Sequence, residues 1–196
     1  EERVEERTAE LARAKRELED AVLLLDEKNR ALDLQSRTDG LTRLANRFGL
    51  DAALKQELQR AQRYGGEFSI ILLDVDRFKN VNDTHGHQVG DTVLVQFANV
   101  LRSCVRDTDV VGRWGGEEFL LICPGIGLEL AKAMAERLRA TISLLEFVNA
   151  GRITSSLGVT THVPGDTVQS MLHRADQALY LAKENGRNRV ELSLAS

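Results

Sequence analysis

A chain of 196 residues, 42% of them hydrophobic and 29% charged, can form one ordinary domain with an added segment. It has no run of about 18 apolar residues, so we expect no membrane-spanning segment. The net charge of −4 comes from the first 36 residues, which hold eleven acidic and seven basic residues, whereas residues 37–196 hold nineteen of each. Without a basic excess, residues 37–196 are a poor candidate for nucleic-acid binding.

The two cysteines, Cys104 and Cys123, lie in apolar segments and lack the spacing of metal ligands. They are best interpreted as core thiols of a protein in the reducing cytoplasm. The chain is charged from its first residue and opens on no signal peptide, which indicates a piece of a longer protein.

Residues 1–36 carry an apolar residue at every seventh position, and no proline or glycine interrupts them: Val4, Leu11, Leu18, Leu25 and Leu32. The pattern predicts one helix about 54 Å long at 1.5 Å per residue. Its register stays open, because the second seam position holds either Thr8, Lys15, Val22 and Asn29 or Arg7, Ala14, Ala21 and Lys28. The alternatives are a solitary charged helix and a parallel two-stranded coiled coil. We favour the weak coiled coil, because it gives the leucines a partner.

Residues 37–196 alternate between helical and strand patterns. Helices are expected at residues 46–64, around 94–105, around 131–145 and at 167–185. Strands are expected at residues 67–76, 152–163 and 189–192, with a hairpin over 110–123 and a short polar piece containing GHQVGD before the second helix. The hairpin breaks strict β–α–β order. The pattern therefore predicts an α+β fold with a mixed, largely antiparallel sheet.

Acidic residues gather where two of these strands end. Asp74 closes the apolar strand SIILL, and Glu117 and Glu118 follow the glycine pair Gly115 and Gly116 at the hairpin tip. Carboxylates brought together in this way are costly unless a divalent cation such as Mg²⁺ or Mn²⁺ neutralises them. Solvated turn acids beside an unrelated aspartate are the alternative, and spacing alone does not separate the two.

The segment DRFKNVNDTHGHQVGD carries polar groups suited to a nucleotide. Lys79 can neutralise phosphate, and Asn82 and Asp91 can hydrogen-bond a purine edge. Neither a P-loop nor a Rossmann glycine motif is present. His85 and His87 have no further cysteine or histidine nearby, which argues against zinc.

Lys183 and Arg187 lie in the segment YLAKENGRNRV at the end of the last helix. They can complement the helix dipole next to a C-terminal Gly186. Alternatively, they reach the terminal phosphates of the same nucleotide.

Together these segments resemble the GGDEF family of bacterial diguanylate cyclases. The resemblance rests on DGLTRLANR, LLDVDRFKNVNDTHGHQVGD, RDTDVVGRWGGEEF, ITSSLGV and RADQALYLAKENGRNRV, which cover residues 37–192 in order. GGEEF is the accepted glutamate variant of the family signature. The resemblance implies a nucleotidyl-cyclase or palm-like fold, with a ferredoxin-like central sheet wrapped by helices. It divides the chain into a signalling coiled-coil helix at residues 1–36 and a catalytic domain at residues 37–196.

By this resemblance, the domain condenses two GTP into cyclic di-GMP and two pyrophosphates. Asp74, Glu118 and the backbone carbonyl of Val75 would bind two Mg²⁺ or Mn²⁺ ions, and Glu117 would help deprotonate the ribose 3′-hydroxyl. The remaining roles fall to groups that would hold guanine, hold phosphate or make room for the nucleotide. They are Asn82 and Asp91 for guanine, Phe78, Lys79, Lys183 and Arg187 for phosphate, and Gly115 and Gly116 at the turn.

One active site makes only half of a product that has two phosphodiester bonds. We therefore expect a homodimer, set by the coiled coil and controlled by an upstream sensor domain. Arg106 and Asp109 match the family's RxxD site for feedback inhibition by cyclic di-GMP, although ordinary surface charge is the alternative. The rival functions are an inactive receptor for GTP or cyclic di-GMP and a purely structural dimerisation module.

Overall fold

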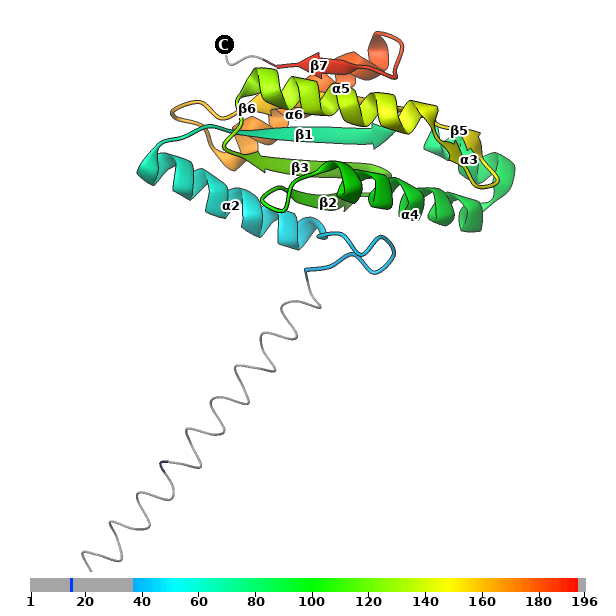
Figure 1. Cartoon of the computed structure of the whole chain (residues 1–196), viewed down its shortest axis with the longest axis horizontal. Helices are drawn as coiled ribbons and strands as arrows, with labels where there is room; N and C mark the ends of the chain where they lie inside the picture. Colours follow the sequence, from blue (N-terminus) through cyan, green and yellow to red (C-terminus); the bar gives the residue numbers. More distant parts are fainter. Residues whose placement is uncertain (1–14, 16–36, 194–196) are drawn as a thin grey trace, which may run out of the picture. The chain divides into compact units, whose positions relative to one another are not determined.

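The computed structural model describes residue 15 and residues 37–193 (Figure 1). The chain divides into two compact units, Glu1–Arg37 and Thr38–Ser196. The predicted coiled coil falls in the first unit, outside the described residues except for residue 15.

The helices and strands of the second unit alternate along the chain. In order they are α2 Arg47–Tyr64, β1 Phe68–Val75, α3 Phe78–His85, α4 His87–Cys104, β2 Val110–Gly115, β3 Glu118–Pro124, α5 Leu128–Leu144, β4 Glu146–Phe147, β5 Gly151–Arg152, β6 Ser155–Thr161, α6 Val168–Glu184 and β7 Val190–Leu192.

Five of the strands form the central sheet in the order β2-β3-β1-β6-β7 (Figure 1). β1 is the middle strand and pairs antiparallel with both β3 and β6. β7 is parallel to β6, and the intervening α6 makes the crossover that a parallel pair requires. The expectation of a mixed, largely antiparallel sheet is confirmed.

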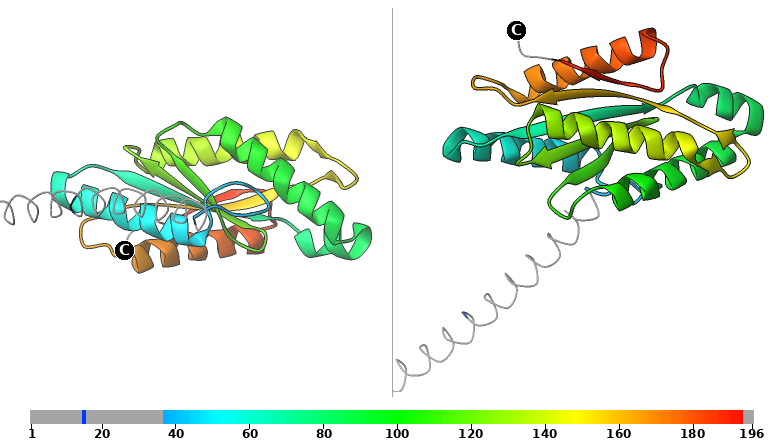
Figure 2. Two further views of the ribbon diagram at one scale, coloured as in Figure 1. Left: turned by 90° about the horizontal axis from the view of Figure 1, so that it is seen from below. Right: turned by 45° about the horizontal axis from the view of Figure 1, so that its top comes forward.

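Helices cover both faces of the sheet, α4 and α5 on one side and α2 and α6 on the other (Figure 2, left). Alternate residues of β1 therefore enter different cores. Ile71 and Leu73 pack in the core with α4 and α5, and Ile70 and Leu72 in the core with α2 and α6. All eight residues of β1 are buried, which explains its continuous apolar run.

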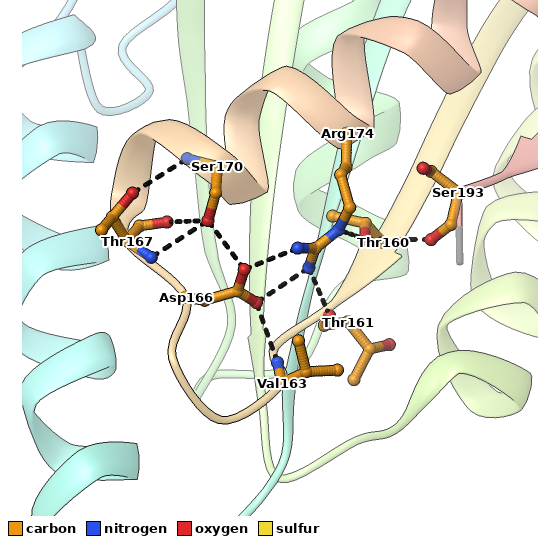
Figure 3. Close-up of polar contacts among 8 residues, drawn as sticks. All are labelled: Thr160, Thr161, Val163, Asp166, Thr167, Ser170, Arg174 and Ser193. Carbon is orange, nitrogen blue, oxygen red and sulfur yellow. Dashed lines mark hydrogen bonds and ion pairs between the residues drawn. The ribbon is translucent and has the colours of Figure 1, made fainter. Parts of the chain in front are cut away.

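The N-terminal end of α6 is fastened to β6 by a closed polar network (Figure 3). Thr167 is the N-cap and forms a capping box with Ser170. Asp166 accepts hydrogen bonds from both terminal nitrogens of Arg174, from the Ser170 hydroxyl and from the Val163 amide. The middle of the helix lies so close to β6 that a Cβ added to Gly158 would be 2.2 Å from the Ala175 carbonyl oxygen.

Two short elements differ from the expectation. The polar piece after β1 forms the helix α3, because Phe78 is buried and anchors its first turn, and GHQVGD forms the start of α4. The segment before β6 contains a small hairpin of β4 and β5, which the strand predicted from residue 152 did not anticipate. Phe147 at this hairpin stacks on Phe97 at a centroid distance of 5.8 Å.

Candidate active site

Asp74 and Glu118 lie opposite each other on neighbouring strands. Asp74 is next to the last residue of β1, and its pairing partners are Glu118 at the start of β3 and Ser156 in β6. Alternation along β1 places Asp74 on the sheet face of Ile70 and Leu72, which α6 covers. Directly paired residues share a face, so both carboxylates lie on the α6 side.

The charge of these two carboxylates is only partly compensated. Burial raises the pKa of Asp74, which is 8% exposed, although a salt bridge from Lys183 at 2.8 Å opposes the rise. Burial also raises the pKa of Glu118, and the negative charge of Asp74 adds to it. The pair therefore carries more negative charge than the single Lys183 ammonium neutralises.

The backbone of Glu117 is hydrogen-bonded to β1 beside Asp74. Its carbonyl oxygen accepts a hydrogen bond from the Val75 amide at 3.3 Å, which links the hairpin turn to the end of β1. The charge of Glu117 contributes to the raised pKa of Asp74. Within the described residues, no group of three or more histidine, cysteine, aspartate or glutamate side chains is arranged to hold a metal ion.

The donor set of two carboxylates fits a hard divalent cation. Magnesium is commonly held by one or two carboxylates, with water and substrate phosphates as the other ligands. The Lys183 ammonium, 2.8 Å from Asp74 Oδ2, shows that positive charge is favourable beside this carboxylate. Asp74 and Glu118 are thus the residues that could hold such an ion.

The turn between β2 and β3 contains Gly115, Gly116 and Glu117 and leads into Glu118. The backbone of its two glycines is accessible. Nothing is within 4 Å of a Cβ added to Gly115 or Gly116, and Gly116 has a φ of +51°. The Gly116 carbonyl accepts a hydrogen bond from Arg113 Nε at 2.8 Å. Arg113 also forms an ion pair with Asp39 at 3.4 Å, so the segment that follows residue 37 is tied to this turn.

Asp39 is suited to this contact because its charge is well supported. Burial alone would raise its pKa, but hydrogen bonds from Thr42 and the charge of Arg113 lower it overall. The Thr42 amide and hydroxyl donate to Asp39 Oδ1 at 2.8 and 2.7 Å. Sequence reasoning missed this contact because Asp39 and Arg113 lie 74 residues apart in the chain.

Helices α3 and α4 bring Asn82 near the residue that precedes Asp91. A Cβ added to Gly90 would be 2.0 Å from Asn82 Oδ1, so the amide lies directly across Gly90. Asn82 is half-buried and Asp91 is exposed, which leaves Asp91 free to meet a ligand beside the amide. In α3, Phe78 is buried and Lys79 is exposed.

Lys183 and Arg187 line different hollows. Lys183 and Glu118 border a cavity of about 470 Å³ along α6, together with Asp176 and Tyr180. Arg187 follows the end of α6 in the left-handed conformation, with a φ of 63°, and borders a cavity of about 370 Å³ beside α3. The structure therefore brings Lys183 to Asp74 and does not bring Arg187 to the same carboxylate.

Arg106 and Asp109 lie at the other end of β2 from the glycine turn. The Arg106 amide donates to Asp109 Oδ2 at 2.9 Å. The second oxygen, Oδ1, is buried and has no hydrogen-bond partner in the described part of the chain. The Arg106 side chain borders a cavity of about 720 Å³ between α4 and α5, together with Leu130 and Arg137.

Asp76 is a further residue of this region that sequence reasoning did not assign. It follows β1 directly, is 6% exposed and accepts three hydrogen bonds, one of them from the Asn188 amide after α6. The only signal for it in the sequence is its two-residue spacing from Asp74, which places both carboxylates on one face of the strand.

The site thus combines a carboxylate pair at the ends of two antiparallel strands with an open glycine turn beside it. A sequence model described as "Diguanylate cyclase, GGDEF domain" matches residues 36–189. The chain belongs to the GGDEF family. Its mixed sheet covered by helices is the GGDEF fold.

Individual relatives agree with this assignment. The chain is 42% identical over 173 residues to the diguanylate cyclase DgcP of Pseudomonas aeruginosa, covering 87% of this chain and 25% of that protein. It is 45% identical over 159 residues to the response regulator PleD of Caulobacter vibrioides, covering 78% and 35%. The chain thus spans about a quarter to a third of these curated relatives.

Among solved structures, the coiled coil and GGDEF domain of DgcB from Caulobacter crescentus, in complex with c-di-GMP, is similar. The TM-score is 0.82 at 34% identity, and the match covers 94% of this chain and 98% of that one. No helix in the described part of our chain is long and apolar enough to cross a membrane.

Proposed function

We propose that this GGDEF domain is a diguanylate cyclase, which condenses two GTP into cyclic di-GMP and two pyrophosphates. The observation that carries the proposal is the carboxylate pair of Asp74 and Glu118, buried in part, short of positive charge and adjacent to the open glycine turn. The relatives named diguanylate cyclase support it.

The reaction sets clear demands on the site. The 3′-hydroxyl oxygen of one GTP attacks the α-phosphorus of another, the bond to the bridging oxygen of the β-phosphate breaks, and pyrophosphate leaves. The hydroxyl proton must go to a base, and we assign this role to Glu117, whose backbone is held to β1 through Val75. Accurate alignment of hydroxyl and phosphorus supplies much of the remaining acceleration.

Asp74, Glu118 and the Val75 carbonyl would hold two divalent ions, magnesium or manganese. Such ions supply Lewis acidity at the α-phosphate and neutralise the leaving group. Without them, the two carboxylates would repel the triphosphate. Lys183 is positioned to compensate part of this charge, since its ammonium is 2.8 Å from Asp74 Oδ2.

The rest of GTP would be held by groups from three other segments. Asn82 and Asp91 suit guanine, because an amide oxygen and a carboxylate accept hydrogen bonds from the ring N–H and the exocyclic amine. Phe78 and Lys79 at the start of α3, with Lys183 and Arg187, would hold the phosphates. The space around Gly115 and Gly116 would let the turn lie against the nucleotide.

A second copy of the domain is needed, since one site holds one GTP and the product has two phosphodiester bonds. The coiled coil of residues 1–36 would bring two domains together and connect them to an upstream sensor. We expect residues 37–196 alone to lose most turnover at low protein concentration and to regain it at high concentration. Full turnover by a proven monomer would contradict the dimer requirement.

Arg106 and Asp109 would form a product-binding site that limits synthesis. Arg106 is exposed and borders the 720 Å³ cavity, where its guanidinium could bind phosphate or guanine, and Asp109 holds this turn by accepting from the Arg106 amide at 2.9 Å. Arg106→Ala should leave initial turnover unchanged and weaken inhibition by cyclic di-GMP by at least about tenfold. Unchanged inhibition would refute this assignment.

The deciding experiment is incubation with GTP and Mg²⁺, followed by chromatography for cyclic di-GMP and an assay of pyrophosphate. Glu118→Ala should lower turnover by at least about a thousandfold, because the carboxylate pair is lost. Glu129→Ala, in the exposed first turn of α5, is the matched control and should be as active as the unaltered chain. A fully active Glu118→Ala variant would remove the basis of the proposal.

The same assay tests the rival function of a receptor. No turnover, together with tight binding of GTP or cyclic di-GMP, would establish an inactive GGDEF domain that acts as a receptor.

A further inference from the structure

The carboxylate of Asp76 is held entirely by neutral donors. Its Oδ1 accepts from the Ser156 hydroxyl at 2.7 Å, and its Oδ2 accepts from the Thr154 hydroxyl at 2.6 Å and from the Asn188 amide at 3.1 Å. No ion pair to it is formed within the described residues. A buried carboxylate is costly unless such bonds satisfy it, and these three bonds hold the Asp76 carboxylate in one place.

Of these three bonds, the one from Asn188 crosses to a separate part of the chain. Ser156 lies in the neighbouring strand β6 and Thr154 directly precedes that strand, whereas Asn188 follows α6 and is 112 residues away from Asp76. The bond fastens the loop between α6 and β7 to the end of β1.

This loop has an unusual backbone. Arg187 and Asn188 both adopt positive φ angles, 63° and 47°, which is costly for residues with a side chain. The Arg187 amide donates to the Ala182 carbonyl at 2.9 Å, as in the Schellman ending of a helix with glycine at position 186. Asn188 is held on its other side by Arg139, which donates to its Oδ1 at 3.0 Å.

The direction of the Arg187 side chain depends on this backbone. Lys183 lies on α6, where the helix fixes its position, but Arg187 lies three residues beyond the last helical residue. Its guanidinium has no hydrogen bond or ion pair in the described part of the chain and borders the 370 Å³ cavity that Asp76 also lines. The connections of this position to the sheet are the Asn188 backbone amide, which donates to Asp76, and the Arg189 carbonyl, which accepts from the Leu157 amide of β6 at 2.9 Å.

We propose that Asp76 is a positioning residue. It accepts a hydrogen bond from the backbone amide of Asn188 and thereby directs the neighbouring Arg187 side chain toward the terminal phosphates of the nucleotide. The inference rests on the proposed function, since it takes Arg187 as a phosphate ligand. The end of β1 then positions two basic side chains, Lys183 and Arg187. Asp74 contacts Lys183, and Asp76, two residues further on the same face, holds the loop that carries Arg187.

The test measures equilibrium binding of a GTP analogue with a methylene group between the α- and β-phosphates, which cannot release pyrophosphate. Asp76→Ala should raise the Kd for this analogue about tenfold and leave the Kd for GMP, which lacks the terminal phosphates, unchanged. Asp76→Asn should bind like the unaltered chain, because its amide oxygen can still accept from Asn188 while its NH₂ donates to Ser156. A purely structural role would weaken the analogue and GMP alike.

A double-mutant cycle tests whether Asp76 affects binding through Arg187. If Asp76 acts through Arg187, then Asp76→Ala should change the Kd for the analogue by less than about twofold in an Arg187→Ala background. Additive losses would overturn the inference, as would equal losses for GMP. Should Asp76→Ala fail to fold, Asp76→Ser gives the same comparison, because its shorter side chain cannot reach Asn188.

The outcomes separate this inference from the proposed function. An unaltered chain that binds the analogue but makes no cyclic di-GMP would refute the cyclase and leave the Asp76 comparison decisive. An unaltered chain that binds no analogue would refute both.

Discussion

Each end of α6 lies against a buried aspartate, Asp166 at its N-terminal end and Asp74 at its C-terminal end. At Asp166, burial alone would raise the pKa, but hydrogen bonds from Arg174, Val163 and Ser170 lower it to about 2 (Figure 3). At Asp74, burial dominates and the pKa is raised, with one lysine as its compensation.

The difference separates stability from function within one helix. At the N-terminal end of α6, hydrogen bonds satisfy both oxygens of Asp166, so the negative charge of this residue stabilises the folded state. The C-terminal end leaves negative charge uncompensated next to Glu118, at a cost in stability that a bound cation would relieve. The same chemical change at the two ends should therefore have opposite consequences.

The largest effect should come from Asp74→Asn. Turnover should fall by at least about a thousandfold, because the carboxylate pair is broken. The melting temperature should stay within about 2 °C of the unaltered value, since the change removes a buried charge while Lys183, partly exposed, can turn to solvent. Turnover assays and calorimetry on one preparation check both parts, and a large loss of stability would contradict the comparison.

Gly158→Ala should disturb both ends of α6 together. The added Cβ would be 2.2 Å from the Ala175 carbonyl oxygen and 2.4 Å from the Leu179 amide nitrogen, so the helix must move away from β6. We expect a loss of about 3–5 kcal/mol in the free energy of unfolding by urea, with loss of turnover. Gly40→Ala is the control, because nothing is within 4 Å of its added Cβ.

Much of this architecture could be predicted from the sequence. The buried strand that carries Asp74, the hairpin with the glycine pair and the last helix were each predicted close to their observed positions, since their signals are local. For Asp74 and the GGEEF acids, spacing alone left a carboxylate site and unrelated turn acids open as alternatives, and the structure pairs Asp74 with Glu118 on neighbouring strands.

The remaining contacts depend on how distant segments pack. The Asp76–Asn188 bond joins residues 112 apart, and the Arg113–Asp39 pair joins residues 74 apart. No period or turn signal encodes such pairs. The short helix α3 was missed for a related reason, because its polar residues give a weak pattern and the packing of Phe78 stabilises it.

Asp166→Asn should reverse the outcome of Asp74→Asn. We expect the free energy of unfolding to fall by about 2–3 kcal/mol, because the charge-assisted bonds from Arg174 weaken and an amide NH₂ meets donors. GTP turnover of the folded protein should stay within about twofold. Glu57→Gln is the matched control, since its ion pair with Arg60, whose side chain is 56% exposed, lies on the surface of α2 and should contribute less than about 0.5 kcal/mol.

The smallest effect should appear in the pH dependence of stability. The folded-state pKa of Asp166 is lowered to about 2, so its contribution is present above the ordinary pKa of about 4 and is lost as the pH falls toward 2. The raised pKa values of Asp74 and Glu118 act with the opposite sign, because stability falls as the pH rises above the ordinary carboxyl pKa values.

Urea titrations between pH 2 and 6 should show a loss of stability below pH 4 that Asp166→Asn largely abolishes. Glu118→Gln should retain that loss and flatten the decline above pH 4, and identical curves for the two variants would mean that the ends of α6 do not differ in this way.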